Sequence, residues 1–275
     1  MEVFLRKIPS TNLNLYKNLS IWIPNAPFEA NLYHAISLIL PRYEQKMLEF
    51  TTGIGMPPAD HPLYPGMVQF VQQEAAHKRV HTKYNQQLVI SGYKIDIVTV
   101  IADLNAYIIT NFTTNAFKIG VCAAGEHLTG IIGVYYESEY NKYLSNSNKN
   151  IREIWHWHAI EELEHSAAMF DFFHYHKFHY PTRLLSYLAS SFWLINPMLI
   201  LGIIVLSIQD RSIFTKKFWK NAAYTLFSPH GLFWQFIKGS VQYMRRDFHP
   251  SENDFSLYVE AYDKSRAAKS YSKAS

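Results

Sequence analysis

Two stretches of the chain carry a glutamate followed three positions later by a histidine. The first, FVQQEAAHKRVH, contains Glu74 and His77, and the second, WHWHAIEELEH, contains Glu162 and His165. Residues with this spacing project from one side of an α-helix, so each pair would present a carboxylate and an imidazole together. The flanking residues are mainly small or apolar, and a carboxylate buried among them needs a compensating partner. A metal ion is the strongest such partner.

Two single glutamates complete the pattern. Glu44 lies in LPRYEQKML and Glu126 lies in CAAGEHLTG. One glutamate from each of two helices plus a Glu-x-x-His from each of two others is the ligand set of dinuclear carboxylate bundles. Four carboxylates balance two divalent ions, and imidazoles favour iron or manganese over magnesium or calcium. We therefore expect two iron ions, with manganese or a mixed iron–manganese pair as alternatives and zinc less favoured. The expected metal ligands are Glu44, Glu74, His77, Glu126, Glu162 and His165.

Three nearby residues are candidates for supporting roles. His81 lies one helical turn beyond His77 and is expected to contact a ligand rather than a metal. Thr129, three residues after Glu126, is the candidate catalytic residue, because its hydroxyl could face an oxygen species on the metals. Glu161 offers an alternative register in which it pairs with His165 at the i, i+4 spacing.

Long helices must position these side chains. Strand-like alternation of useful length and repeats of fixed period are both absent from the sequence. Apolar residues recur at helical spacing from Phe28 to Phe50, and Pro41 is expected to kink this helix. The remaining pattern predicts a Pro/Gly loop at 51–66, a helix at about 66–88, two helices within 94–140 with a break near 111–114, and a motif helix capped by Asn148 or Asn150 that stops before Pro181. The sequence therefore predicts an all-α fold with a four-helix bundle core and additional C-terminal helices.

The chain is divided on composition into four parts. We expect an irregular lead-in over 1–27, the metal-binding bundle over 28–180, apolar C-terminal helices over 181–256, and a disordered tail over 257–275.

Charge and cysteine usage limit the function classes. The net charge is +4 without a run of Lys or Arg, which argues against a nucleic-acid partner. The single cysteine excludes an intrachain disulfide, and the N-terminus lacks a signal-peptide core, so we expect a cytoplasmic protein.

Residues 184–209 contain no charged side chain and are long enough to span a bilayer, which takes about 20 residues. Pro197, at the centre of this run, is expected to split it into two shorter helices. Two interpretations stay open. The run either forms a helical hairpin that covers the bundle core, or it associates with the inner face of the membrane as an apolar platform.

Several segments also resemble a known family. They are PRYE (41–44), FVQQEAAHKRVHTKYN (70–85), AAGEHLTG (123–130), WHWHAIEELEH (155–165) and FHPSENDF (248–255). Together they resemble a bacterial family labelled predicted metal-dependent hydrolase, whose members are similar to ferritin-like helical proteins. The likeness covers about residues 35–256 and implies a ferritin-like bundle. Tyr43 stands where that family would have a glycine.

The motif His158-x-x-x-Glu162-x-x-His165 is similar to the fourth helix of the p-aminobenzoate N-oxygenase family, in which a third histidine joins the di-iron site. This resemblance implies that His158 is a seventh ligand. The alternative is a histidine hydrogen-bonded to a ligating carboxylate.

These observations lead to one favoured function and two alternatives. We expect a non-haem di-iron oxygenase or oxidase that activates O2 with an electron donor and oxidises a small organic substrate, in a homodimer. The first alternative is a metal-dependent hydrolase that uses a hydroxide held by two metals. The second is a metal storage or structural site.

Overall fold

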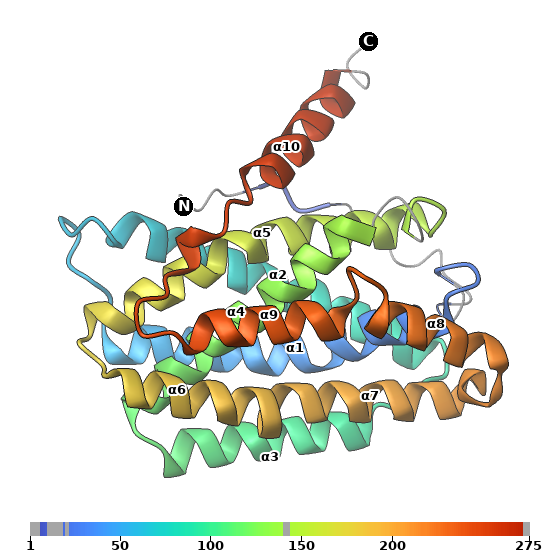
Figure 1. Ribbon diagram of the computed structural model, residues 1–275, viewed down its shortest axis with the longest axis horizontal. Helices are drawn as coiled ribbons and strands as arrows, with labels where there is room; N and C mark the ends of the chain where they lie inside the picture. The colour runs from blue at the N-terminus through green and yellow to red at the C-terminus, as the bar shows by residue number, and fades with distance from the viewer. Residues whose placement is uncertain (1–5, 10–18, 20–21, 140–143, 272–275) are drawn as a thin grey trace.

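The computed structural model describes residues 6–9, 19, 22–139 and 144–271 (Figure 1). Within this part of the chain all regular elements are helical, which confirms the predicted all-α class. The α-helices are α1 (Pro27–Ile54), α2 (Tyr64–Ile90), α3 (Asp96–Phe112), α4 (Asn115–Glu139), α5 (Lys149–Tyr175), α6 (Tyr180–Ala189), α7 (Ile195–Gln209), α8 (Lys216–Phe227), α9 (Leu232–Met244) and α10 (Ser256–Tyr271). Much of the expected lead-in over 1–27 lies outside the described residues.

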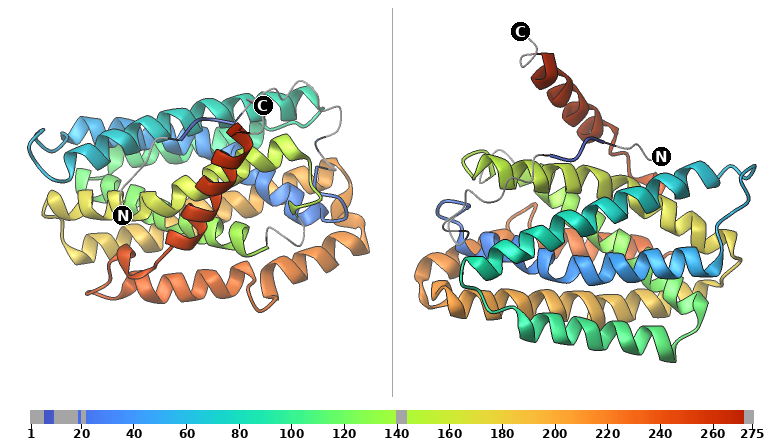
Figure 2. Two further views of the ribbon diagram at one scale, coloured as in Figure 1. Left: turned by 90° about the horizontal axis from the view of Figure 1, so that it is seen from above. Right: turned by 180° about the vertical axis from the view of Figure 1, so that it is seen from behind.

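Four long helices form the bundle that carries the glutamates and histidines. Helices α1 and α2 pack together, α4 packs on α5, and the two pairs meet through contacts of α1 with α4 and of α2 with α5. Figure 2 shows these helices side by side from two further directions. Around them, α3, α7 and α8 pack on α1, while α6 and α9 pack on α4.

The helix boundaries follow from local sequence signals. Pro27 stands at the start of α1, where its missing amide donor is not needed, and Gly55 ends the helix with φ 105°. The Asn148 side chain accepts hydrogen bonds from the amides of Asn150 and Ile151 and so caps α5. The break between α3 and α4 falls at residues 113–114, inside the expected range.

The apolar run after α5 does not fold back as a hairpin. Helices α6 and α7 continue in one direction, joined by a π-helical turn, η4 (Ser190–Leu194) (Figure 1). This wider turn lies just before Pro197 and accommodates the missing amide donor without reversing the chain. The hairpin expectation is therefore wrong, and the run lies along the bundle with Gly202 against Ala35 of α1.

The expectation of a disordered tail over 257–275 is wrong for the described residues, because residues 256–271 form α10. Tyr262 is buried, and its ring lies 4.7 Å from that of His156 on α5. Asp263 accepts a 3.2 Å hydrogen bond from Arg6. The segment is polar in composition, so the sequence did not indicate its buried tyrosine or the ion pair between Asp263 and Arg6.

Within the described part of the chain, two helical stretches are long and apolar enough to cross a membrane by length and composition alone. The first, Asn115–Ser138, is 67% buried, so its apolar character reflects the bundle core. The second, Tyr180–Gln209, is 33% buried and leaves apolar side chains on the surface. This is weak evidence for a membrane location.

Candidate metal centre

The four bundle helices bring the predicted polar residues into the molecular interior. Each of these side chains is at most 3% exposed. Helix α1 contributes Glu44, α2 contributes Glu74 and His77, α4 contributes Glu126, and α5 contributes Glu162 and His165. Sequence spacing predicted the convergence within α2 and within α5, whereas only the tertiary fold brings the two pairs together.

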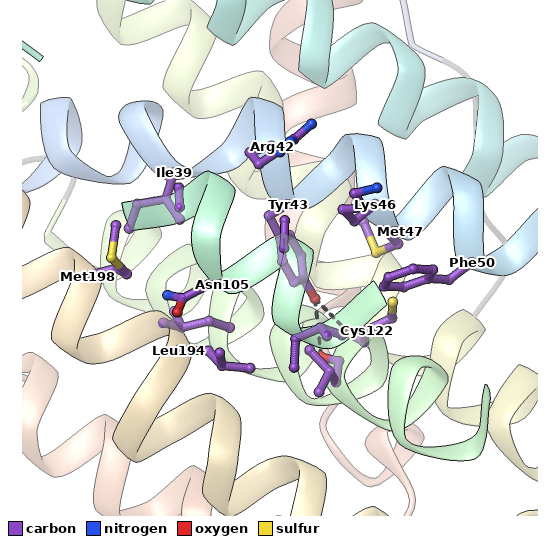
Figure 3. A pocket seen from close by; sticks show the side chains of 15 residues that line it. Ile39, Arg42, Tyr43, Lys46, Met47, Phe50, Asn105, Cys122, Leu194 and Met198 are labelled. Atoms are coloured by element: carbon purple, nitrogen blue, oxygen red, sulfur yellow. Dashed lines mark hydrogen bonds between the residues drawn. The ribbon is translucent and has the colours of Figure 1, made fainter. Parts of the chain in front are cut away.

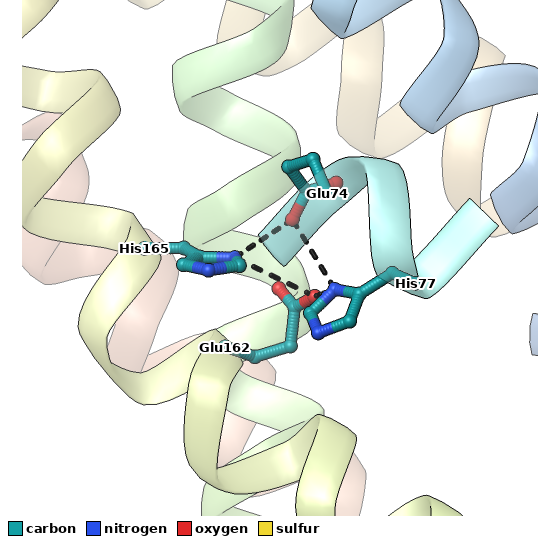
Figure 4. Close-up of side chains that lie close together, drawn as sticks. All are labelled: Glu74, His77, Glu162 and His165. Atoms are coloured by element: carbon teal, nitrogen blue, oxygen red, sulfur yellow. Dashed lines mark ion pairs between the residues drawn. The ribbon is translucent and has the colours of Figure 1, made fainter. Parts of the chain in front are cut away.

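The inward atoms of the two Glu-x-x-His pairs lie within 4.8 Å of one another. His165 Nδ1 lies 2.9 Å from Glu74 Oε1 and 3.2 Å from Glu126 Oε2. His77 Nδ1 lies 3.3 Å from Glu74 Oε1 and 3.4 Å from Glu162 Oε1. Figure 4 shows the two imidazoles and two carboxylates facing a common centre.

A second group of possible ligand atoms lies within the same 4.8 Å limit and comprises Glu44, His81 and His158. The two groups are linked by Glu162, because its Oε1 atom lies 3.1 Å from His158 Nε2. Two adjoining groups of possible ligand atoms, drawn from α1, α2 and α5, fit a dinuclear site.

Many inward atoms of this centre have no hydrogen-bond partner among the described residues. They are both oxygens of Glu44 and of Glu74, Oε2 of Glu126, and Nδ1 of His77 and of His165. Buried polar atoms are normally hydrogen-bonded, and unpaired buried carboxylates are especially costly. Divalent metal ions would satisfy all of these atoms, so the residues present fit a dinuclear metal site.

The outer nitrogens of the two imidazoles are held by hydrogen bonds. His77 Nε2 donates to Glu161 Oε2 at 2.8 Å, and His165 Nε2 donates to Gln73 Oε1 at 2.9 Å. Each bond leaves Nδ1 as the inward nitrogen, as in metal sites whose histidines are oriented by a carboxylate or amide. Glu161 therefore contacts His77. The alternative register required Glu161 to pair with His165 instead. Sequence reasoning missed Gln73, because a glutamine beside a ligand position carries no distinguishing signal.

A longer chain of contacts orients His158, and it begins at Pro41. Because Pro41 has no amide hydrogen, the carbonyl of Ser37 lacks its helical donor, and Asn85 Nδ2 of α2 supplies one at 2.7 Å. The Asn85 amide oxygen then accepts the Ser37 hydroxyl proton at 2.8 Å. His81 Nδ1 lies 3.0 Å from the Ser37 oxygen and must donate to it.

This arrangement determines the proton positions further along the chain. With Nδ1 protonated, the neutral His81 ring has an unprotonated Nε2, which lies 3.2 Å from His158 Nδ1. His158 Nδ1 is therefore the donor, and its unprotonated Nε2 faces Glu162. The geometry thus directs one nitrogen of His158 into the centre and places His81 against His158. The predictions that His158 binds a metal and that His81 supports it stay predictions.

Electrostatics without metal show how strongly the carboxylates repel one another. Burial and the neighbouring Glu74 raise the pKa of Glu44 well above its usual range. Burial and Glu162 do the same for Glu126. For Glu162 burial alone would raise the pKa, but the nearby imidazoles outweigh it and lower the pKa. Burial lowers the pKa of His158 to about 3, so its ring is neutral at neutral pH and able to bind a metal.

Tyr43, the departure from the family pattern, has a clear place in the fold. Its hydroxyl donates to the Cys122 carbonyl at 2.9 Å, as Figure 3 shows. A Cβ atom at position 125 would overlap this hydroxyl, so Gly125 accommodates the Tyr43 ring. The small residue beside Glu126 therefore serves helix packing at this point.

Thr129 lies at the edge of the centre. Its hydroxyl donates to Glu162 Oε2 and lies 3.2 Å from the Glu126 carbonyl oxygen. The structure thus places the hydroxyl on a candidate ligand, where it orients the carboxylate. A direct part in the chemistry stays a prediction.

Residues 11–254 match the model of a family described as Predicted metal-dependent hydrolase. The chain belongs to this family. Comparison with curated proteins and with solved structures gave no match. The family match covers all seven predicted ligands, and the buried His/Glu cluster suggests a dinuclear metal site, whose metal it does not identify.

The family corrects our main functional expectation. We expected an oxygenase or oxidase on the histidine-rich ligand set and the likeness of one helix, with O2 and an electron donor as co-reactants. The family that matches most of the chain is named for hydrolysis, and this favours the alternative that we had placed second. The physical reason for the error is that the same ligand set can serve either chemistry, since carboxylates and imidazoles bind the metals in both.

Proposed function

We propose that this protein is a hydrolase whose activity depends on two divalent metal ions held between α1, α2, α4 and α5. The observation that carries the proposal is the set of buried carboxylate and imidazole atoms that point inward without a hydrogen-bond partner. The expected ligands are Glu44, Glu74, His77, Glu126, His158, Glu162 and His165. Carboxylate and imidazole donors of this kind suit manganese, iron or zinc.

When bound, two such ions can lower the pKa of a water molecule and polarise a carbonyl or phosphoryl oxygen of a substrate. The protein residues have separate tasks around them. Glu161 and Gln73 orient the two inner imidazoles, and the Thr129 hydroxyl orients Glu162. The rings of Trp157 and Phe70 cover the outer sides of these imidazoles at 4.8 and 4.9 Å between centroids, and so exclude water.

The test combines metal quantification with a substrate panel. Protein purified without added metal is analysed for iron, manganese and zinc, and metal-free protein is reloaded with each and assayed on carboxylic esters, amides and phosphoesters. We expect about two ions per chain and hydrolysis that a chelator abolishes and reloading restores. Glu74→Gln should lose both metal retention and activity, whereas the exposed Glu260→Gln should keep both. Many irons per chain would indicate storage, and hydrolysis indifferent to chelation would refute the proposal.

A further inference from the structure

A cavity of about 480 Å³ lies between α4, α7, α8 and α9. Its volume is within the range of about 300–1,000 Å³ that is usual for small-molecule sites. Among the described lining residues, all side chains are aliphatic or aromatic except those of Thr129 and Asn196. The cavity therefore offers an apolar ligand almost no hydrogen-bonding group along its walls.

Thr129 connects the cavity to the metal centre. Thr129 lines the cavity, and the same hydroxyl donates to Glu162 Oε2. Leu128, on the preceding position of α4, also lines the wall. A molecule in this cavity would therefore lie one side chain away from a candidate metal ligand.

The shape of the cavity is elongated. Its lining residues on α7 extend from Ile195 to Ile204, and because a helix rises about 1.5 Å per residue they cover about 14 Å. The lining residues Trp219, Phe227 and Phe233 are 59%, 57% and 42% exposed, so the cavity opens to the surface beside them. Helix α8, which carries Trp219, also has exposed lysines at positions 216, 217 and 220. Aromatic side chains beside lysines are typical of a surface that meets amphiphiles or lipid head groups.

Two other cavities fit a substrate less well. The one beside Tyr43 and Cys122 has a volume of only about 70 Å³ (Figure 3). A groove of about 650 Å³ between α1, α2 and α3 is lined by charged side chains that include Arg42, Lys78 and Asp103. Neither has a lining residue that donates to a candidate metal ligand among the described residues.

From these contacts we infer that the substrate is a carboxylic ester or amide with a linear alkyl chain, which the cavity of α4, α7, α8 and α9 binds while the polar end lies at Thr129 and the metal centre. The inference rests on the proposed hydrolase function. In the reaction a water oxygen bonds to the acyl carbon, the bond from that carbon to the leaving oxygen or nitrogen breaks, and a water proton ends on the leaving group.

The first test measures binding without chemistry. Metal-free, full-length protein is titrated with hexanol, octanol and decanol by calorimetry. Each added methylene should tighten binding about fourfold, the value for transfer of one methylene out of water. Leu199→Trp fills the cavity and should weaken decanol binding about tenfold or more. Val100→Trp on α3, at a position 64% exposed and outside the cavity, is the matched control and should bind decanol normally. If Leu199→Trp does not fold, Ile204→Glu at the cavity opening, 41% exposed, replaces it.

The second test separates this inference from the proposed function. Metal-loaded protein is assayed on esters of increasing acyl length, presented as monomers or in vesicles of phosphatidylcholine and phosphatidylglycerol. We expect kcat/KM to rise with chain length and Leu199→Trp to abolish that rise while short esters are still cleaved. Preference for vesicles would identify a membrane lipid as the source, and preference for monomers a free amphiphile. Decanol binding without any hydrolysis would overturn the hydrolase and leave an alkyl-binding site. Hydrolysis without chain-length dependence or decanol binding would overturn the substrate inference alone.

Discussion

His158 shows how one backbone feature can determine the state of a distant side chain. Pro41 withholds an amide hydrogen, Asn85 replaces it, and the side chain of Ser37 then requires a proton from His81. The result is a neutral His158 whose Nε2 is free to bind. We had expected Pro41 to kink α1; the effect that the structure shows is on hydrogen bonding. His81 is thus a positioning residue for the metal centre.

Replacing His81 with phenylalanine tests this role. An aromatic ring is kept, but His158 Nδ1 loses its acceptor, so the tautomer of His158 is no longer determined. Loss of such an orienting partner typically weakens metal affinity about 10–100-fold. Competition titration with a chelator measures the affinity, and circular dichroism confirms that the helices are retained. The control Thr82→Ala changes the neighbouring, exposed position on α2. Unchanged affinity in His81→Phe would refute the positioning role.

Among the elements, α5 is the one whose sequence and structure agree most closely. The polar run before it caps the helix through Asn148, and its buried face carries His158, Glu162 and His165. The apolar run of α6 and α7 shows the opposite case. Pro197 in a helical pattern predicts a break, but the chain forms a π-helical turn just before it and continues in the same direction. Helix α4 packs against α6 and helix α1 packs against α7, and these contacts keep α6 and α7 aligned.

The capping role of Asn148 predicts a stability effect without a functional one. Asn148→Ala removes an acceptor from the first turn of α5, and loss of such a cap typically costs about 1 kcal/mol of the free energy of unfolding. Urea unfolding of metal-free protein measures the change. Asn146→Ala, at an exposed position of the same loop, should stay within about 0.5 kcal/mol of the parent. Metal stoichiometry should be the same in both variants, and a loss of metal in Asn148→Ala would show that the cap also shapes the centre.

For the whole molecule, buried neutral histidines couple folding to pH. His127 donates from Nε2 to the Gly239 carbonyl at 3.0 Å, and burial lowers its pKa from 6.5 to about 4. The unfolded chain therefore binds a proton at a higher pH than the folded protein does. The stability associated with His127 is present above about pH 6.5 and is lost as the pH falls toward 4.

His127→Gln should reduce this pH dependence. Between pH 7 and pH 5 the parent protein should lose about 2 kcal/mol more unfolding free energy than the variant. Denaturant unfolding of metal-free protein at the two pH values measures the difference. The exposed His230→Gln is the control for loss of a histidine. Equal pH dependence of parent and His127→Gln would show that His127 is protonated alike in the folded and unfolded states.

Exposed apolar side chains on the surface of the molecule bear on the question of whether residues 184–209 associate with a membrane. Phe192 and Trp193 are 69% and 72% exposed on the continuous rod of α6 and α7. Exposed apolar patches of this kind mark contacts with lipid or protein. We predict that the parent protein floats with vesicles containing anionic lipid and that Phe192→Glu with Trp193→Glu does not. Equal flotation of the two proteins would show that this rod does not meet the membrane.

Sequence spacing alone determined which residues share a helix face, because the period of an α-helix is set by backbone hydrogen bonding. Spacing therefore predicted the two Glu-x-x-His pairs, and local composition predicted a break within 111–114 and a cap at Asn148 or Asn150. The structure has the break at 113–114 and the cap at Asn148. Only the tertiary structure showed that Glu161 and Gln73 hold the outer nitrogens and that an apolar cavity adjoins Thr129. Those contacts join residues of different helices, and helix packing, which depends on many side chains at once, decides which faces meet.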